Sequence, residues 1–171
     1  MVTLVVGVPD SGKSALAEDL TVKMAGDGKK IYVATMEVLD EEGKKRVEKH
    51  KKLRDGKGFL TVEAPVEVSK ALADVPEIGH ATVLLECISN LVGNVMHGDE
   101  FRENTVEAVV KDVVRLCRMA GNVVLVTNSF PADDDGYEDD TRQYVRCLDE
   151  VNERLYKVAD VIYKFRSEEH I

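Results

Sequence analysis

The sequence is poor in cysteine, and its cysteines lie far apart. The 171 residues include three of them, Cys87, Cys117 and Cys147. No C-x-x-C pair occurs, so the spacing predicts neither a structural zinc site nor a disulfide framework. We therefore interpret the three as buried thiols.

Basic residues and long apolar runs are also scarce. The chain has 23 basic residues against 32 acidic ones, a formal net charge of −9, whereas a nucleic-acid-binding protein needs a basic face. No apolar run approaches the ~18 residues of a membrane-spanning helix, and residues 1–8 are too short and uncharged for a signal peptide. We therefore expect a cytoplasmic protein with no membrane span and no nucleic-acid partner. A nucleotide ligand, which needs only a local positive site, is compatible with this composition.

Short β-branched runs alternate with amphipathic stretches along the chain. Several runs are continuously apolar, which is typical of parallel strands covered on both faces. The expected strands are Val2–Val6, Ile31–Thr35, Leu60–Glu63, Thr82–Glu86, Val123–Thr127 and Val161–Phe165. The clearest expected helices are Ser14–Ala25, Thr105–Ala120 and Asp139–Val158. This alternation, with no linker, predicts a single α/β domain over residues 1–171 with a mostly parallel sheet.

An acidic stretch interrupts this pattern. Residues 128–140 read NSFPADDDGYEDD and show no periodicity. Non-periodic segments of this length are usually functional loops or disordered, so we expect a mobile loop here.

The first expected strand runs directly into a glycine-rich turn. The turn reads G-V-P-D-S-G-K-S and matches G-x-x-x-x-G-K-[ST], with a strand before it and a helix after it, as a phosphate-binding loop requires. Backbone N–H groups of such a loop surround an anion, its lysine reaches the β- and γ-phosphates, and its serine offers a hydroxyl to Mg²⁺. The sequence thus predicts a P-loop NTPase-like three-layer domain. The expected nucleotide-binding residues of the loop are Gly7, Val8, Pro9, Asp10, Ser11, Gly12, Lys13 and Ser14.

A carboxylate that shares Mg²⁺ with Ser14 should close a second buried strand. Glu86 ends the apolar run TVLLE, and a charged residue at the end of a buried strand needs a reason. Magnesium binding supplies one, and a solvent-facing strand end is the alternative.

A highly charged segment contains the histidine of greatest interest. Arg46, His50 and Arg54 follow one another at four-residue intervals, so they share one face of a helix. Two cations beside an imidazole suit a nucleotide phosphate, and a neutral imidazole there could attack it. On spacing alone, a solvated charged helix face is the better interpretation.

The order of motifs resembles the bifunctional adenosylcobinamide kinase/adenosylcobinamide-phosphate guanylyltransferase family of cobalamin biosynthesis. The resemblance covers most of the chain, in this order: GVPDSGKS, YVATMEVLDEE, RVEKHKKLR, TVEAP, VLLECISNLVGN, VVLVTN, RQYVRCLDEVNERL and ADVIY. It implies two activities on a corrinoid substrate. One is phosphorylation of the aminopropanol hydroxyl of adenosylcobinamide by GTP or ATP. The other is transfer of GMP from GTP to that phosphate through a guanylylated histidine. By the same analogy a homo-oligomer is expected.

The resemblance also implies roles for individual residues. His50 matches the nucleophilic histidine of the family, with Lys13 as the second catalytic residue, and Ser14 and Glu86 match the positions that hold Mg²⁺. The nucleotide-binding positions outside the phosphate loop match Thr35, Arg46, Arg54, Glu63 and Glu86. With the resemblance, covalent chemistry at His50 becomes the preferred interpretation.

The chain departs from the family pattern at several places. The family often has an arginine within the phosphate loop, where this chain has Asp10, and a tryptophan where this chain has Phe59. Its usual glycine-rich stretch is replaced here by the acidic residues 128–140. Two other functions therefore stay open. One is a small-molecule P-loop kinase without a covalent intermediate, and the other is a GTP-binding regulator that has lost catalysis.

Overall fold

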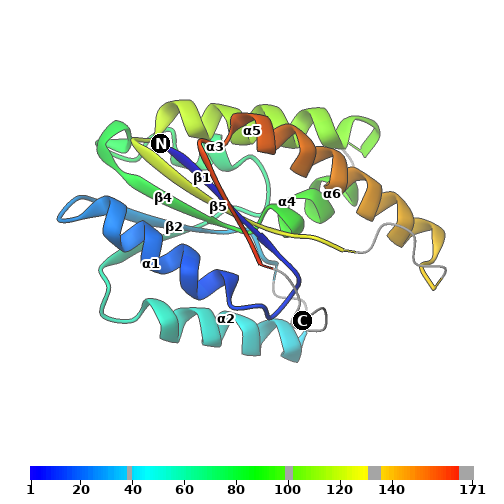
Figure 1. The fold of residues 1–171 in the computed structure, drawn as a ribbon, viewed down its shortest axis with the longest axis horizontal. Helices are drawn as coiled ribbons and strands as arrows, with labels where there is room; N and C mark the ends of the chain where they lie inside the picture. The colour runs from blue at the N-terminus through cyan, green and yellow to red at the C-terminus, as the bar shows by residue number, and fades with distance from the viewer. Residues whose placement is uncertain (38–39, 99–101, 131–135, 166–171) are drawn as a thin grey trace.

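A six-stranded, entirely parallel sheet forms the centre of the protein (Figure 1). The computed structural model describes residues 1–37, 40–98, 102–130 and 136–165. The strand order is β3-β2-β4-β5-β1-β6. The strands are β1 (Val2–Gly7), β2 (Lys30–Ala34), β3 (Phe59–Glu63), β4 (Thr82–Glu86), β5 (Asn122–Asn128) and β6 (Val161–Lys164). Each agrees with an expected strand to within one residue at either end.

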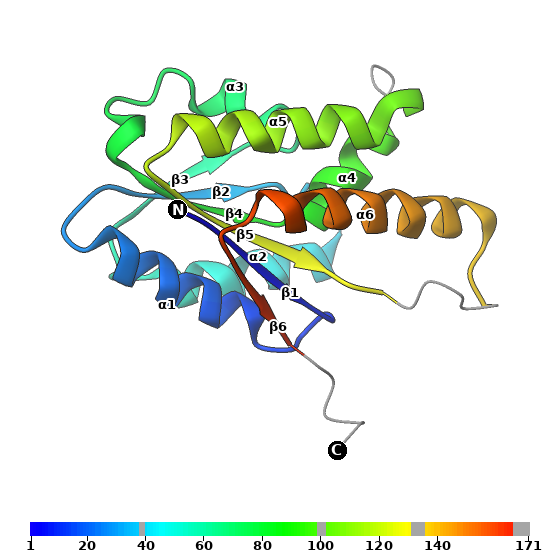
Figure 2. The ribbon, with the colours of Figure 1, turned by 45° about the horizontal axis from the view of Figure 1, so that its top comes forward.

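Helices cover the sheet on both faces and complete three layers (Figures 1 and 2). On one side lie α1 (Lys13–Ala25) and α2 (Glu41–Arg54), and on the other α4 (Ile88–Met96), α5 (Thr105–Met119) and α6 (Asp139–Val158). The short helices are α3 (Val68–Leu72), η1 (Ile78–His80) and η2 (Arg102–Asn104). No helix in the described residues is both long and apolar enough to cross a bilayer.

The acidic stretch lies between β5 and α6. Its central residues, 131–135, lie outside the described residues, so the expectation of a mobile loop stays a prediction. Its last two residues, Asp139 and Asp140, already form the first turn of α6. Acidic side chains are favourable there because the helix N-terminus carries a partial positive charge.

Residues that alternate along each strand build two separate cores. Leu4 and Val6 join the larger cluster under α3–α6, while Val5 joins the smaller cluster beside α1. Because successive side chains of a strand point to opposite faces, each strand needs apolar residues in series, as the sequence shows. The same period places Tyr32 and Leu84 in the cluster beside α1. The side chain of Glu86, two residues after Leu84, therefore lies on that face as well.

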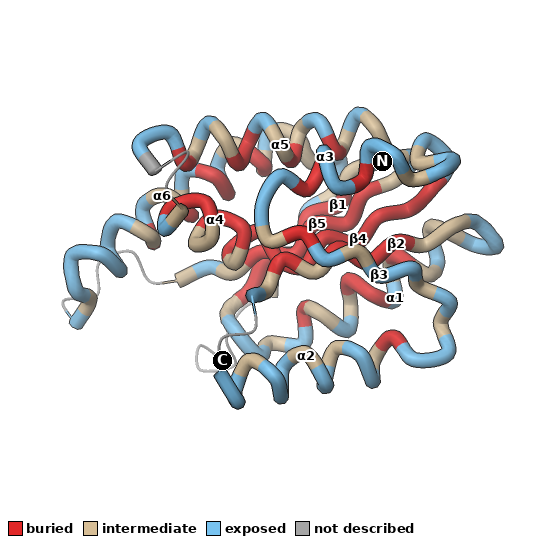
Figure 3. The backbone as a smooth tube through the Cα atoms, turned by 180° about the vertical axis from the view of Figure 1, so that it is seen from behind, coloured by how far each residue is buried: buried red, intermediate tan, exposed pale blue. Residues whose placement is uncertain are grey.

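In contrast to the other long helices, α2 is largely exposed (Figure 3). Its N-terminus is capped by the carboxylate of Asp40, which accepts from the amide of Gly43 at 2.7 Å. Acidic residues occupy its first turn and basic residues its last. These charges stabilise the helix because they lie next to the opposite partial charges of its dipole. Beyond its C-terminus, the ammonium group of Lys57 pairs with Glu18 on α1. Caps, charge and a few side-chain contacts, rather than a broad apolar face, therefore hold α2 in place.

Candidate nucleotide-binding and phosphoryl-transfer site

The phosphate loop connects β1 to α1 and depends on two glycines. Gly12 has φ 88°, a left-handed conformation in which side chains are strained. A Cβ atom on Gly7 would lie 2.7 Å from the Ser11 hydroxyl and 2.9 Å from the Cβ atom of Phe165. The left-handed turn at Gly12 and the close approach at Gly7 therefore both favour a residue without a side chain.

The loop forms one wall of a cavity of about 420 Å³, a volume within the usual range for small-ligand sites. The other walls include α2 and the carboxyl ends of β2, β3, β4 and β5. Most residues expected from the sequence line it together: Pro9, Asp10, Ser11, Gly12, Lys13, Ser14, Arg46, His50, Arg54, Glu63 and Glu86. Three expected residues, Gly7, Val8 and Thr35, are not among the lining residues.

Thr35 lies behind the cavity wall. Its side chain is fully buried, and its hydroxyl accepts from the amide of Cys87 at 2.7 Å and donates to the carbonyl of the same residue at 2.8 Å. Its own amide donates to the carbonyl of Glu86 at 3.1 Å. In this structure Thr35 therefore joins the end of β2 to the segment after β4 and supports Glu86 from behind.

Lys13 places a buried cation among the residues that line the cavity. The residue is 7% exposed, and its ammonium group donates to the carbonyl of Val8 at 3.2 Å. Burial lowers the pKa of Lys13 below its ordinary value, and the neighbouring charges of Glu86 and Asp10 oppose part of that shift. A buried cation is costly without a partner, so an anionic ligand would stabilise this site.

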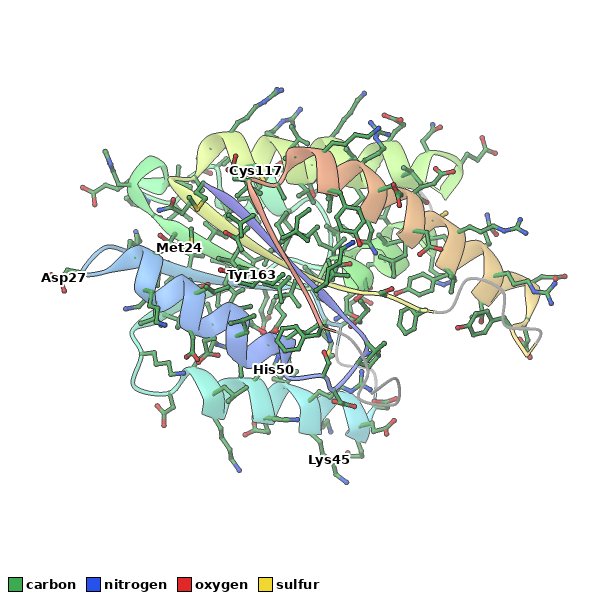
Figure 4. All side chains as sticks on the ribbon, viewed as in Figure 1. Met24, Asp27, Lys45, His50, Cys117 and Tyr163 are labelled. Carbon is green, nitrogen blue, oxygen red and sulfur yellow. The ribbon has the colours of Figure 1, made fainter. Side chains whose placement is uncertain are left out.

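Glu86 and His50 contact each other across the cavity. Oε2 of Glu86 lies 2.8 Å from Nδ1 of His50 and accepts a hydrogen bond from the hydroxyl of Tyr32 at 2.6 Å. Figure 4 shows His50 pointing from α2 toward the sheet and Lys45 pointing away from it. The charged helix thus turns its histidine inward, and the solvated-face interpretation is wrong for this residue.

The carboxyl group of Glu86 is ionised despite its burial. Burial by itself would raise its pKa, but the hydrogen bond with His50, helped by those with Ser14 and Tyr32, lowers the pKa overall. Tyr32 responds in the opposite direction, because burial and then the charge of Glu86 raise its pKa. At neutral pH the tyrosine hydroxyl therefore donates the hydrogen bond, and the ionised carboxylate of Glu86 accepts it.

The two arginines of α2 both line the cavity, and Arg54 also contacts the sheet. The guanidinium carbon of Arg54 lies 3.6 Å from the centre of the Tyr32 ring, within the range of a cation–π contact worth about 0.5–2 kcal/mol. Within α2, all of which the structure describes, Arg54 is the single buried residue.

The site also offers oxygen ligands for a divalent cation. Oε1 of Glu86 is buried and has no hydrogen-bond partner among the described residues, and Ser14 lies close enough to help lower the pKa of this carboxyl group. The described residues contain no cluster of three or more acidic, histidine or cysteine side chains able to hold a metal. Since Mg²⁺ in such sites takes one or two protein oxygens together with substrate phosphates, these residues fit a nucleotide-bound Mg²⁺.

Sequence reasoning missed Tyr32 as a site residue. The signal was present, because the two-residue period of β2 places this tyrosine on the face of α1. Its strand neighbours are in register with the end of β4, with Tyr32 opposite Leu84 and Ala34 opposite Glu86. A long side chain at Tyr32 can therefore reach diagonally to Glu86.

Comparison with known proteins gives one family. A family model described as cobinamide kinase / cobinamide phosphate guanyltransferase matches residues 3–167. A bifunctional adenosylcobalamin biosynthesis protein CobU from Escherichia coli (strain K12) is 33% identical, covering 75% of this chain and 75% of its own length. The protein of the same name from Salmonella typhimurium (strain LT2) is 28% identical, covering 95% and 94%.

Solved structures support the fold. A solved ATPase domain superposes with a TM-score of 0.59 at 10% identity, covering 99% of this chain and 70% of that chain. The flagellar accessory protein FlaH from Methanocaldococcus jannaschii superposes with a TM-score of 0.51 at 14% identity, covering 95% and 70%. The predicted P-loop NTPase-like three-layer fold is therefore confirmed.

Proposed function

The chain belongs to the cobinamide kinase / cobinamide phosphate guanyltransferase family, and we propose that it carries out both reactions in cobalamin biosynthesis, the second through a GMP–His50 intermediate. One reaction moves the γ-phosphoryl group of GTP or ATP to the aminopropanol hydroxyl of adenosylcobinamide. The other moves GMP from GTP to the resulting phosphate. The observation that carries the covalent step is the 2.8 Å contact between Glu86 and His50 in the cavity that Lys13 also lines.

This contact favours a nucleophilic imidazole. When Nδ1–H donates to Glu86, the lone pair resides on Nε2, because the hydrogen bond at one ring nitrogen sets the state of the other. The carboxylate also stabilises the positive charge that develops on the ring during attack. His50 thus has the two properties of an activated nucleophile, a defined orientation and a supporting base.

The transfer of GMP then proceeds in two displacements. The Nε2 lone pair of His50 attacks the α-phosphorus of GTP, a P–N bond forms, and the P–O bond to the β-phosphate breaks to release pyrophosphate. An oxygen of the cobinamide phosphate next attacks the same phosphorus, and the P–N bond electrons return to Nε2. Lys13 and Arg46 neutralise the charge of the phosphates during both displacements.

The kinase reaction uses the same loop. Lys13 and the backbone N–H groups of residues 10–14 hold the β- and γ-phosphates. The acceptor hydroxyl attacks the γ-phosphorus, the P–O bond to the β-phosphate breaks to release the nucleoside diphosphate, and the hydroxyl proton is released to solvent. Mg²⁺ bound to the nucleotide, with Ser14 and Glu86 as its protein ligands, would supply charge neutralisation on the phosphates.

Two labelled nucleotides test the covalent step. With Mg²⁺, GTP labelled at the α-phosphate should leave an acid-labile, base-stable label on the protein, and GTP labelled at the γ-phosphate should leave none. His50→Ala should lose the label and still bind GTP. His80→Ala is the matched control, because His80 is exposed and does not line the cavity. This variant should be labelled normally. Labelling that persists in His50→Ala, or none in the wild type, would contradict the proposal and leave a simple kinase or a nucleotide-binding regulator.

A further inference from the structure

Tyr32 connects the two sides of the site. Its hydroxyl oxygen lies 2.6 Å from Oε2 of Glu86 and 3.1 Å from Nδ1 of His50. The guanidinium carbon of Arg54, one helical turn after His50, lies 3.6 Å from the centre of its ring. The side chain of Tyr32 thus contacts both His50 and Arg54, which lie one helical turn apart on the inward face of α2.

The distances place a proton on Nδ1 of His50. Oε2 of Glu86 lies within hydrogen-bond distance of both the tyrosine oxygen, at 2.6 Å, and the histidine Nδ1, at 2.8 Å. An ionised carboxylate can only accept, so each neighbour has to direct a proton at it. The single hydroxyl proton of Tyr32 is used in the shorter contact, and Nδ1 must therefore carry its own proton. Otherwise two lone pairs would face each other at 2.8 Å.

The same cluster gives the two carboxylate oxygens of Glu86 different surroundings. Oε2 accepts from Tyr32 and His50, whereas Oε1 is buried without a hydrogen-bond partner among the described residues. A half-turn of the carboxylate about its own axis would exchange the two oxygens and their environments. The hydrogen bond from the tyrosine hydroxyl opposes this rotation, because the position of Tyr32 is itself fixed by packing. Tyr32 is 4% exposed, and its ring contacts both the guanidinium group of Arg54 and the ring of Phe59, whose centre lies 6.5 Å from its own.

We propose that Tyr32 is a positioning residue for the guanylyl-transfer reaction. By holding Oε2 of Glu86, it keeps His50 in the tautomer whose Nε2 lone pair is available for attack, and it reserves Oε1 for the metal-bound nucleotide. This inference rests on the proposed function of His50. A purely structural Tyr32 would instead contribute packing and stability, with no effect on the tautomer of His50.

The test compares two tyrosine-to-phenylalanine variants of the full chain. Tyr32→Phe removes the hydroxyl that contacts Glu86 and His50. Tyr144→Phe is the matched control, since it removes a part-buried hydroxyl that donates to the carbonyl of Ser89 at 3.0 Å and has no contact with His50. The first measurement is the tautomer of His50, read from the ¹⁵N chemical shifts of its ring in the nucleotide-free protein. The second is the single-turnover rate of labelling with α-labelled GTP, alongside the GTP dissociation constant.

The wild type and Tyr144→Phe should show the Nδ1–H tautomer and label at equal rates. Tyr32→Phe should show a mixture of tautomers and label about 10- to 100-fold more slowly, the range found when a supporting hydrogen bond behind a ligating or reacting group is removed. Its GTP dissociation constant should change by less than about twofold, because the phosphate loop is intact.

Each other outcome overturns the inference or separates it from the proposed function. A wild-type His50 that carries a proton on Nε2, either as the Nε2–H tautomer or as a doubly protonated ring, overturns it, whatever the variants do. An unchanged tautomer or an unchanged labelling rate in Tyr32→Phe overturns it while the proposed function stands. A wild type that takes no label, but whose tautomer changes in Tyr32→Phe, contradicts the covalent reaction and supports the positioning of His50 by Tyr32.

Discussion

Glu86 at the end of β4 and His50 in the third turn of α2 meet at 2.8 Å, and this contact joins the two halves of the site. On one side, Glu86 ends a central strand of the sheet, and the phosphate loop follows β1 of the same sheet. On the other, His50 belongs to a helix that is largely exposed. A nucleotide bound at the loop would therefore meet the histidine only as long as α2 keeps this contact.

Removing the charge of Lys13 should abolish tight nucleotide binding and stabilise the empty protein. Lys13→Met should weaken the affinity for Mg·GTP at least about tenfold, because a hydrogen bond to a charged group is worth about 1.5–3 kcal/mol. The buried cation, whose pKa is lowered by burial, costs free energy in the absence of a ligand, so its loss should raise the free energy of unfolding by on the order of 1 kcal/mol. Calorimetric titration and urea unfolding measure the two effects.

Lys23→Met is the control for Lys13→Met, because Lys23 lies on the same helix with an exposed side chain. It should change neither quantity. Equal affinity for GTP in wild type and Lys13→Met would show that the loop serves structure alone.

Gly12→Ala should disturb the loop through the backbone. At φ 88° an alanine is strained, and such strain costs of the order of 1–3 kcal/mol. We expect a lower melting temperature and weaker GTP binding. Gly79→Ala serves as the comparison, since a Cβ atom there would lie in ordinary contact, 3.8 Å from the carbonyl oxygen of Met119. If both variants were equally stable, the strained turn would not be required.

The carboxylate of Asp112 on α5 should prove important for stability. It accepts from the amides of Val68 and Ser69 at 2.8 and 2.9 Å and from the Ser69 hydroxyl at 2.6 Å. Asp112→Ala leaves these donors without an acceptor, so it should lower the free energy of unfolding by about 1–3 kcal/mol. Asp19→Ala, at an exposed position of α1, should stay within about 0.5 kcal/mol. If urea unfolding gave Asp112→Ala the same free energy of unfolding as the wild type, this account of α3 would be contradicted.

Stability at alkaline pH should depend on Cys117. Burial raises the pKa of this thiol from an ordinary value of 9.0 to about 11, so the folded protein disfavours the thiolate. The resulting stabilisation is present below pH 9 and is lost as the pH rises from about 9 to about 11. Urea unfolding at about pH 8 and at about pH 10.5 should show a larger loss in the wild type than in Cys117→Ala, by at most about 2 kcal/mol. Identical losses would show that this thiol titrates equally in both states.

The sheet could be predicted from the sequence because its signals are local. Each strand is a short apolar run, and the bounds of β4 and α6 agree with their expected ranges. The phosphate loop was found in the same way, since its glycines and its lysine are neighbours in the chain. The short helix α3 was not, because the groups that cap its N-terminus come from Asp112 on a different helix, and no local pattern records such a contact.

The candidate site was predictable in membership more than in arrangement. His50, Arg54 and Glu86 were expected in one site and line one cavity. Their partners depend on tertiary structure, because Tyr32 joins them only when β2 lies beside β4 and α2 lies over both. Tyr32 receives the guanidinium group of Arg54, and Thr35 turns out to join β2 to Cys87. Spacing along a helix or strand shows which residues share a face. The residues that this face contacts depend on the tertiary structure.

One measurement tests the covalent transfer most directly. The protein is incubated with GTP and Mg²⁺, its intact mass is recorded, and adenosylcobinamide phosphate is then added. We predict a gain of one GMP group, located on His50 by peptide mapping, which disappears on addition of the corrinoid as the GMP moves to its phosphate. A protein whose mass never changes, or an adduct on another residue that the corrinoid does not remove, would contradict guanylyl transfer through His50.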